Sequence, residues 1–286
     1  MAARATKLSA EMAPDVALRL IVADCRVDLS KYRAIVLQSR RPIGIHQTRV
    51  AFRRMRAAFS VFRGALNGPA VRSLSAEARW LAGECAPARD LHVFLTETVE
   101  GVPPAVSRIA ARLAAVHLQR ARAALSGARF NAFDRQLIAF ADQPPSGRNT
   151  RLDDFGREVL EKRHRKVERR GRGLEELNAE ELHELRIAIK KQRYAATFLQ
   201  PAFASAAAKP YIETTVRLQG ALGALNDRAV AAQMLADIAT ATRPTEDVAG
   251  ALKALAKQAA GGDKRRRRKL ERAWKDFKKA ERFWLA

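Results

Sequence analysis

The sequence of 286 residues has few cysteines, few aromatic residues and too few acidic residues to balance its basic ones. Its two cysteines, Cys25 and Cys85, cannot build a disulfide framework, and they fit a reducing compartment. No apolar run approaches the roughly 20 residues that a membrane-spanning helix needs. The first residues include Glu11 and Asp15 instead of the uninterrupted apolar segment of a signal peptide. These absences predict a soluble cytoplasmic protein with no membrane partner.

The shortage of acidic residues leaves a large positive charge. The chain has 53 Lys and Arg against 30 Asp and Glu, so its formal net charge is +23. Both halves of the chain are cationic, and hydrophobic residues make up 48% of the whole, which excludes a disordered basic tail protein. Such an excess of cations in a folded chain predicts a polyanionic partner.

The spacing of apolar residues predicts an all-α fold. Alanine is abundant, and apolar residues recur three and four positions apart almost throughout the chain. Helix ends are expected at residues 41–44, 67–69, 101–104, 126–127, 142–150, 171–173, 200–201, 242–244 and 261–262, where Pro, Gly or polar residues cluster. Helices of roughly 16 to 30 residues between these breaks predict about four in each half, packed as antiparallel bundles. Asn178 and Glu181 have the spacing of a capping box.

An internal repeat relates the two halves of the chain. Residues 45–56 return as residues 182–193, 137 positions later, and this offset places His46 opposite His183. The same register pairs Leu81 with Leu218, Gly83 with Gly220, Asp90 with Asp227, Val93 with Val230, Arg26 with Arg163 and Arg33 with Arg170. A register kept over roughly seventy residues predicts two copies of one four-helix unit, related by a pseudo-two-fold axis. We expect residues 1–143 and 144–286 to form these two halves, together one domain.

Each copy contains a helix with a cationic face. At about 100° of rotation per residue, the first copy gathers His46, Arg49, Arg53, Arg56 and Arg63 on one stripe. The second copy places His183, Arg186, Lys190 and Arg193 in the same angular positions as the first four. Arg54 and Lys191 lie about 80° beyond the edge of the stripe. The neighbouring sector of the first helix is apolar, so we expect Phe52, Phe59 and Phe62 to lie in the core.

Carboxylates are missing around both cationic faces. No acidic residue occurs from position 29 to 76, where there are ten Lys or Arg, and none occurs from 185 to 212. A helix face with several cations and no acid repels itself, so an anion from outside the helix is expected to neutralise it. If the two faces oppose each other, they line a groove suited to a linear polyanion, whose phosphates arginine forks would bind through charge-assisted hydrogen bonds.

These patterns give two groups of candidate phosphate-binding residues. The primary candidates are His46, Arg49, Arg53, Arg56, His183, Arg186, Lys190 and Arg193. Second-tier candidates are Arg54, Lys191, Arg26, Arg33, Arg163 and Arg170, for which a solvated outer face is the alternative. The two histidines either donate to phosphate or make structural hydrogen bonds near the helix starts. Neither histidine has a His or Cys partner at metal-ligand spacing, so no metal or other cofactor is expected.

Two further features have alternative roles. Asp90 and Asp227 follow the cationic helices, and we expect them to pair with arginines and hold these helices in place. The six consecutive cations of residues 264–269 either extend a polyanion-binding surface or make the last helix soluble.

The motif helices resemble the CHAD family, which is named for its histidines and α-helices. Each copy has the pattern His-x-x-Arg-(Val/Ile)-Ala-x-(Arg/Lys)-(Arg/Lys)-x-Arg, and a later helix ends in Arg89-Asp90-Leu91 or Asn226-Asp227-Arg228. The resemblance runs from about residue 15 to 283. It implies two four-helix halves around a basic central cavity that binds inorganic polyphosphate and takes the protein to polyphosphate granules. The sequence departs from the family pattern at His92, where a second Asp is common, and at Asn226, where the first copy has Arg.

The expected function is therefore non-catalytic binding of inorganic polyphosphate, with no catalytic residues. Some relatives carry a triphosphate-processing domain with a Glu-x-Glu-x-Lys motif, and this sequence has no such motif. An enzyme acting on phosphoanhydrides would need a carboxylate cluster for magnesium or a phosphate-binding glycine loop, and neither is visible. The main alternative is a nucleic-acid-binding protein, but aromatic residues make up only 6% and offer no stacking platform.

Overall fold

The computed structural model describes residues 8–93, 101–145, 150–241, 245–260 and 263–285. Within these ranges the chain forms helices joined by turns and contains no strand, which confirms the all-α prediction. The α-helices are α1 (Pro14–Gln38), α2 (Pro42–Val61), α3 (Pro69–Glu84), α4 (Ala86–Val93), α5 (Pro104–Ser126), α6 (Ala128–Ala141), α7 (Leu152–Arg170), α8 (Ala179–Leu199), α9 (Ala208–Ala241), α10 (Glu246–Ala260) and α11 (Asp263–Lys279). Two short 3₁₀ turns, η1 (Phe62–Gly64) and η3 (Gln200–Ala202), follow α2 and α8.

Prolines start several helices at the positions that the sequence predicts. Pro42, Pro69 and Pro104 are the first residues of α2, α3 and α5. Proline suits this position because its φ angle is already helical and the missing N–H would have no partner inside the helix. The polar segment at the midpoint separates α6 from α7, as expected.

The helix boundaries follow the offset of the repeat. α2 begins at Pro42 and α8 at Ala179, 137 residues later, and each is followed by a 3₁₀ turn. The two copies differ at Cys85, where α3 and α4 separate, whereas α9 is continuous. Pro87 explains this break because proline cannot continue a helix without losing a hydrogen bond, and its counterpart in α9 is Ala224. When α3 and α4 together are matched with α9, the described residues of each half form five corresponding helical segments, where the sequence predicts about four.

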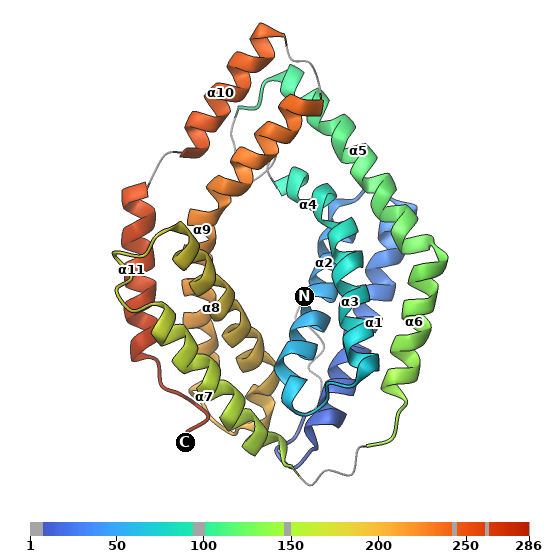
Figure 1. Cartoon of the computed structure of the whole chain (residues 1–286), viewed down its shortest axis with the longest axis vertical. Coiled ribbons are helices and arrows are strands. Elements are labelled where there is room, and N and C mark those ends of the chain that lie inside the picture. The colour runs from blue at the N-terminus through green and yellow to red at the C-terminus, as the bar shows by residue number, and fades with distance from the viewer. Residues whose placement is uncertain (1–7, 94–100, 146–149, 242–244, 261–262, 286) are drawn as a thin grey trace.

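The helices are arranged in a ring (Figure 1). One side contains α1 to α6, and the other contains α7 to α11. At one end of the ring α2 contacts α8 and α1 contacts α7, and at the other end α5 contacts α9 and α10. The two halves of the chain therefore meet at two separate places.

The main apolar core continues across the first of these contacts. Phe52, Phe59 and Phe62 are buried, as the helical pattern predicts. Phe62 stacks on Phe155 of α7 with a ring-centroid distance of 5.5 Å, so aromatic packing joins the two halves. At the far end of the ring a smaller cluster, which includes Leu91 and Leu252, joins α4, α5, α9 and α10.

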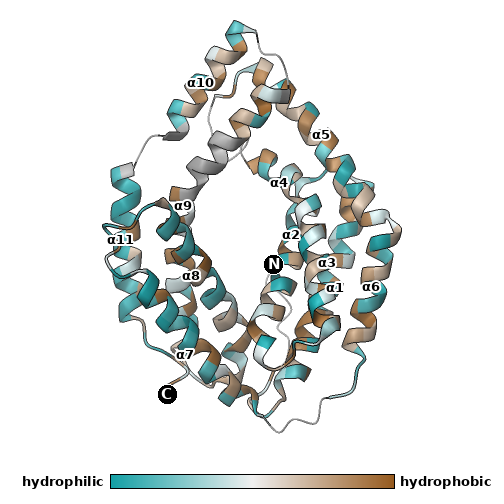
Figure 2. Cartoon of the chain, in the orientation of Figure 1, coloured by the Kyte–Doolittle hydropathy of each residue, from teal (hydrophilic) through white to brown (hydrophobic). Residues whose placement is uncertain are grey.

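Polar and apolar residues alternate along most helices, and α7 and α11 are largely hydrophilic (Figure 2). Among the described residues, no helix has the length and apolar character needed to cross a bilayer. Cys25 and Cys85 are both free and buried, and burial raises the pKa of each thiol to about 12. Both therefore serve as small core residues.

Candidate functional site

Close packing against α1 fixes the orientation of α2. A side-chain Cβ at Gly44 would lie 3.0 Å from the backbone nitrogen of Val36, so the glycine permits the close approach of the two helices. Buried Phe52 and Met55 then hold the apolar side of α2 in the core. The other side presents Arg53 and Arg56 toward the second half of the chain.

A capping box fixes the start of α8. The Asn178 Oδ1 atom accepts hydrogen bonds from the backbone N–H groups of Glu180 at 2.9 Å and Glu181 at 3.0 Å. The Glu181 carboxylate accepts one from the backbone N–H of Asn178 at 2.8 Å. This confirms the predicted capping box and satisfies N–H groups that have no partner inside the helix.

Two arginines tie the halves together where α2 meets α8. The Nε atom of Arg53 donates to the Tyr194 hydroxyl at 2.8 Å. Arg163 of α7 donates to the backbone carbonyl of Ser60 at 2.6 Å and to that of Lys191 at 3.1 Å. These bonds link α2, α7 and α8, and they set the spacing of the cationic residues on either side.

A basic cavity of about 910 Å³ lies at this contact, and we call it the junction cavity. Its cations from the first half are Arg53, Arg56, Arg63, Arg72 and Arg79. Its cations from the second half are Arg163, Lys190 and Lys191. No carboxylate lines the junction cavity, so within the described part of the chain it is a concentrated positive site.

The charges in the junction cavity destabilise one another. Burial and the positive charges of Arg53, Arg186, Arg56 and Arg193 lower the pKa of Lys190 to about 8. Burial also lowers the pKa of Arg56, and Arg79 adds to the effect. A bound anion would relieve this repulsion, so the arrangement of cations in the unliganded site favours binding of an anion.

Lys190 makes binding of an anion dependent on pH. Its pKa of about 8 lies below the ordinary value for lysine, so in the free protein the charge is lost as the pH rises through 8. A bound polyanion favours the protonated form, and proton uptake should accompany binding above this pH. We expect the affinity of the cavity for a polyanion to fall by up to about tenfold between pH 7 and pH 9.

Calorimetric titration across this pH range would measure the effect. Lys190→Arg is the matched variant because arginine keeps its charge at pH 9. Its affinity should stay nearly level over the same range. An equal loss of affinity in the variant and the wild type would show that another group controls the pH dependence.

The structure brings part of the predicted site together. Arg53, Arg56 and Lys190 line the junction cavity, as do the second-tier candidates Lys191 and Arg163. Arg186 does not line it but lies close enough to affect the charge of Lys190.

Other primary candidates lie outside the cavity lining. Arg49 forms an ion pair with Asp90 at 3.3 Å, which confirms the pairing expected for this aspartate. The Nε atom of Arg193 donates to the Gln219 side chain at 2.8 Å. His46 and His183 are the fifth residues of α2 and α8, and neither lines the junction cavity.

Four second-tier arginines hold helices together away from the junction cavity. Arg26 makes two hydrogen bonds to Asp134, at 2.7 and 2.8 Å. Arg33 donates to the Leu125 carbonyl at 2.6 Å. Arg54 pairs with Asp28 at 2.9 Å, and Arg170 pairs with Glu184 at 3.2 Å. Each of these cations has a protein partner, and none of the four lines the junction cavity.

No residue of α3 is among the candidates selected from the sequence. Arg72 and Arg79 of α3 extend the cationic wall beyond the motif helix, and Arg63 lies in the 3₁₀ turn between α2 and α3. The helical stripe already includes Arg63, and the acid-free stretch from residue 29 to 76 was the signal that could have pointed to Arg72.

Of two other features singled out in the sequence, the cationic run lies away from the junction cavity, and the Asp227 side chain lies outside the described residues. The cationic run 264–269 begins α11 on the outer side of the ring, where the Arg267 side chain donates to the Glu175 carbonyl at 3.2 Å. The side chains of Asn226, Asp227 and Arg228 lie outside the described part, so the expected pairing of Asp227 stays a prediction.

Comparisons with known proteins agree with this architecture. The crystal structure of the CHAD domain from the plant Ricinus communis matches with a TM-score of 0.84 and 23% identity, over 99% of this chain and 97% of that chain. PptA from Streptomyces chartreusis matches with a TM-score of 0.62 and 15% identity, over 95% of this chain and 99% of that chain. None of the curated proteins matches the sequence. A family model described as CHAD domain matches residues 20–236, which is most of the sequence. The chain therefore belongs to the CHAD family.

Proposed function

We propose that this protein binds inorganic polyphosphate in the junction cavity without altering it chemically. One observation carries the proposal: eight cations from both halves of the chain line a single cavity that no carboxylate lines. Arginine and lysine side chains make charge-assisted hydrogen bonds to phosphate oxygens. A chain with a negative charge on each phosphate matches a site with cations on several walls.

The charges of Arg56, Arg79 and Lys190 are available to a ligand. None of these three side chains pairs with a carboxylate within the described residues. Their mutual repulsion is present before binding, and an anion removes it. The free energy released in this way favours a ligand with several charges over orthophosphate, which carries few.

Nucleic acid is the second candidate, and the aromatic residues of the junction cavity weigh against it. Trp80 has the guanidinium of Arg129 over its ring, 3.7 Å from the ring centroid. Tyr194 stacks on Phe198 and has Arg193 over its ring at 4.5 Å. Because protein groups already contact these rings, they leave less aromatic surface for the base stacking that single-stranded nucleic acids use.

We also propose that binding is not followed by hydrolysis. No carboxylate or histidine lines the junction cavity to activate a water molecule as a general base. Binding alone would place the protein on polyphosphate granules in the cytoplasm wherever the polymer accumulates.

Salt dependence tests the electrostatic mechanism. Each phosphate that the protein neutralises releases condensed counterions, by analogy with nucleic acids. If four phosphates are neutralised, doubling the salt concentration should weaken binding by about sevenfold. Titrations of long-chain polyphosphate over a series of sodium chloride concentrations would measure the slope. An affinity that does not change with salt would contradict this mechanism.

A further inference from the structure

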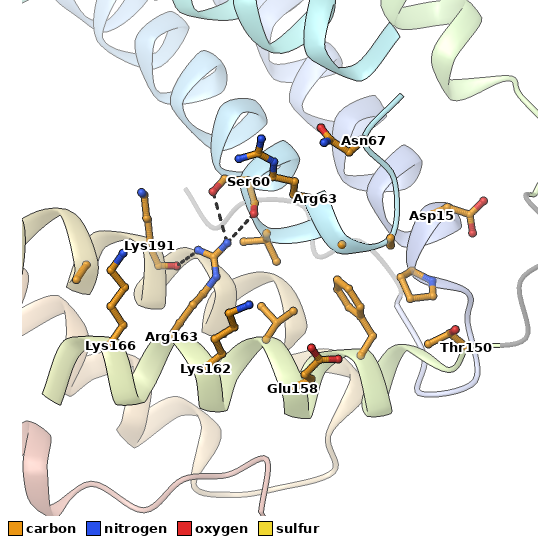
Figure 3. Close-up of a pocket in the computed structure, with 17 residues that line it drawn as sticks. Asp15, Ser60, Arg63, Asn67, Thr150, Glu158, Lys162, Arg163, Lys166 and Lys191 are labelled. Carbon is orange, nitrogen blue, oxygen red and sulfur yellow. Dashed lines mark hydrogen bonds between the residues drawn. The ribbon is translucent and has the colours of Figure 1, made fainter. Parts of the chain in front are cut away.

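A second cavity, of about 840 Å³, adjoins the junction cavity (Figure 3). It lies between α7 and the turn that follows α2. The two cavities share five lining residues: Ser60, Arg63, Asn67, Arg163 and Lys191. A ligand that passes these shared residues would move from one cavity into the other.

The charges of the second cavity are arranged unevenly. Lys162 and Lys166 lie on the same side as Arg163 and Lys191 (Figure 3). Glu158 also lines this cavity, on α7 next to Lys162 and on the side away from Lys166 (Figure 3). Asp15 and Thr150 lie at the other end, where the Asp15 carboxylate pairs with Arg19 at 3.0 Å. The cationic side is therefore the one continuous with the junction cavity.

Lys162 and Lys166 differ from other cations of α7. They are four residues apart, so they lie on one face of the helix about 6 Å apart along its axis. Both are exposed, and neither pairs with a carboxylate in the described part of the chain. By contrast, Arg165 pairs with Glu161 at 2.7 Å, and Arg157 pairs with Asp154 at 3.3 Å.

Lys166 is close enough to the shared residues to act with them. Burial, together with the charges of Lys166 and Arg163, lowers the pKa of Lys191. The unpaired cations therefore form one series, which runs from Lys190 through Lys191 to Lys166 and Lys162.

We propose that the second cavity extends the polyphosphate site, so that a long chain passes the shared residues and places further phosphates beside Lys162 and Lys166. This inference rests on the proposed function. Chains that reach both cavities should bind more tightly than short ones. The gain should exceed the statistical one that a long chain has because more of its segments can occupy the site. The protein would thereby select polyphosphate by length.

The double variant Lys162→Glu with Lys166→Glu tests the extension. We expect its affinity for long-chain polyphosphate to fall by about tenfold, because two phosphate contacts become repulsive. Its affinity for tripolyphosphate, which the junction cavity alone can hold, should fall much less, because only the effect of the reversed charges on neighbours such as Lys191 remains. Both side chains are exposed, so circular dichroism should show unchanged helicity.

Lys253→Glu with Lys257→Glu is the matched control. These lysines are also exposed and four residues apart, but they lie on α10 at the opposite end of the ring. The control variant should bind both ligands as the wild type does.

The outcomes separate the inference from the proposed function. A wild type that binds no polyphosphate contradicts the proposed function, and the inference fails with it. If the wild type binds and the double variant loses no more affinity than the control, the extension is wrong. An equal loss for tripolyphosphate and the long chain would also overturn it, because short ligands would then occupy the second cavity directly.

Discussion

Reversing the charges of Arg56, Arg79 and Lys190 together is expected to lower the affinity for polyphosphate by at least about a thousandfold. All three side chains line the junction cavity, and Lys190 is surrounded by arginines. Each hydrogen bond to a charged group contributes about 1.5–3 kcal/mol. Losing three therefore costs about 4.5–9 kcal/mol, which corresponds to a thousandfold or more in affinity. The new carboxylates would in addition repel phosphate.

The same variant should keep its fold. Glutamates among the remaining cations replace like-charge repulsion with attraction, so the free energy of unfolding should not fall. Circular dichroism and thermal unfolding would check this. A matched control reverses Arg112, Lys253 and Lys257, which are exposed on α5 and α10. If the cavity variant keeps its affinity, polyphosphate binds elsewhere, and the cationic start of α11 becomes the first place to examine.

Helix ends could be predicted from the sequence where local chemistry decides them. Prolines at positions 42, 69 and 104 and the Asn178 capping box act within one helical turn, so a single sequence shows their effect. The break at Cys85 was not predicted. Its cause, Pro87, is also local, but it interrupts an otherwise regular apolar pattern.

The candidate site was only partly predictable, because pairing depends on distant segments. The repeat and the helical stripe identify Arg53, Arg56 and Lys190 correctly as neighbours of one cavity. They do not distinguish these residues from Arg26, which pairs with Asp134, 108 residues away. Arg33 likewise bonds to the Leu125 carbonyl, 92 residues away. Only the packing of α1 against α5 and α6 shows that these cations already have partners.

His164 is a core residue that the sequence gives no reason to place in the core. It lies within a basic run, yet it is 3% exposed and its Nδ1 atom is 2.9 Å from the Tyr211 hydroxyl. Aromatic rings from α9, α11 and the segment after α11 surround it, and burial lowers its pKa. The local pattern of α7 suggests solvent on this side because the covering rings belong to Tyr211, Phe277 and Trp284, which lie 47 or more positions later in the chain.

The proposed function requires the junction cavity to fit a slim polyanion better than a generally basic surface would. A competition titration at physiological salt measures this difference, with long-chain polyphosphate, single-stranded nucleic acid and double-stranded nucleic acid as competitors and orthophosphate as a control. A duplex carries its phosphates on the outside of a wide helix, so it could touch only the rim of the junction cavity. Single strands would find aromatic rings that protein groups already cover in part.

We expect polyphosphate to compete about a hundredfold more strongly than either nucleic acid, and orthophosphate to compete weakly. Such a preference would mean that the shape of the junction cavity and the arrangement of its cations, and not net charge alone, determine the affinity. Equal competition by nucleic acid, or a preference for it, would contradict the account and leave the charge of +23 as a general polyanion-binding surface.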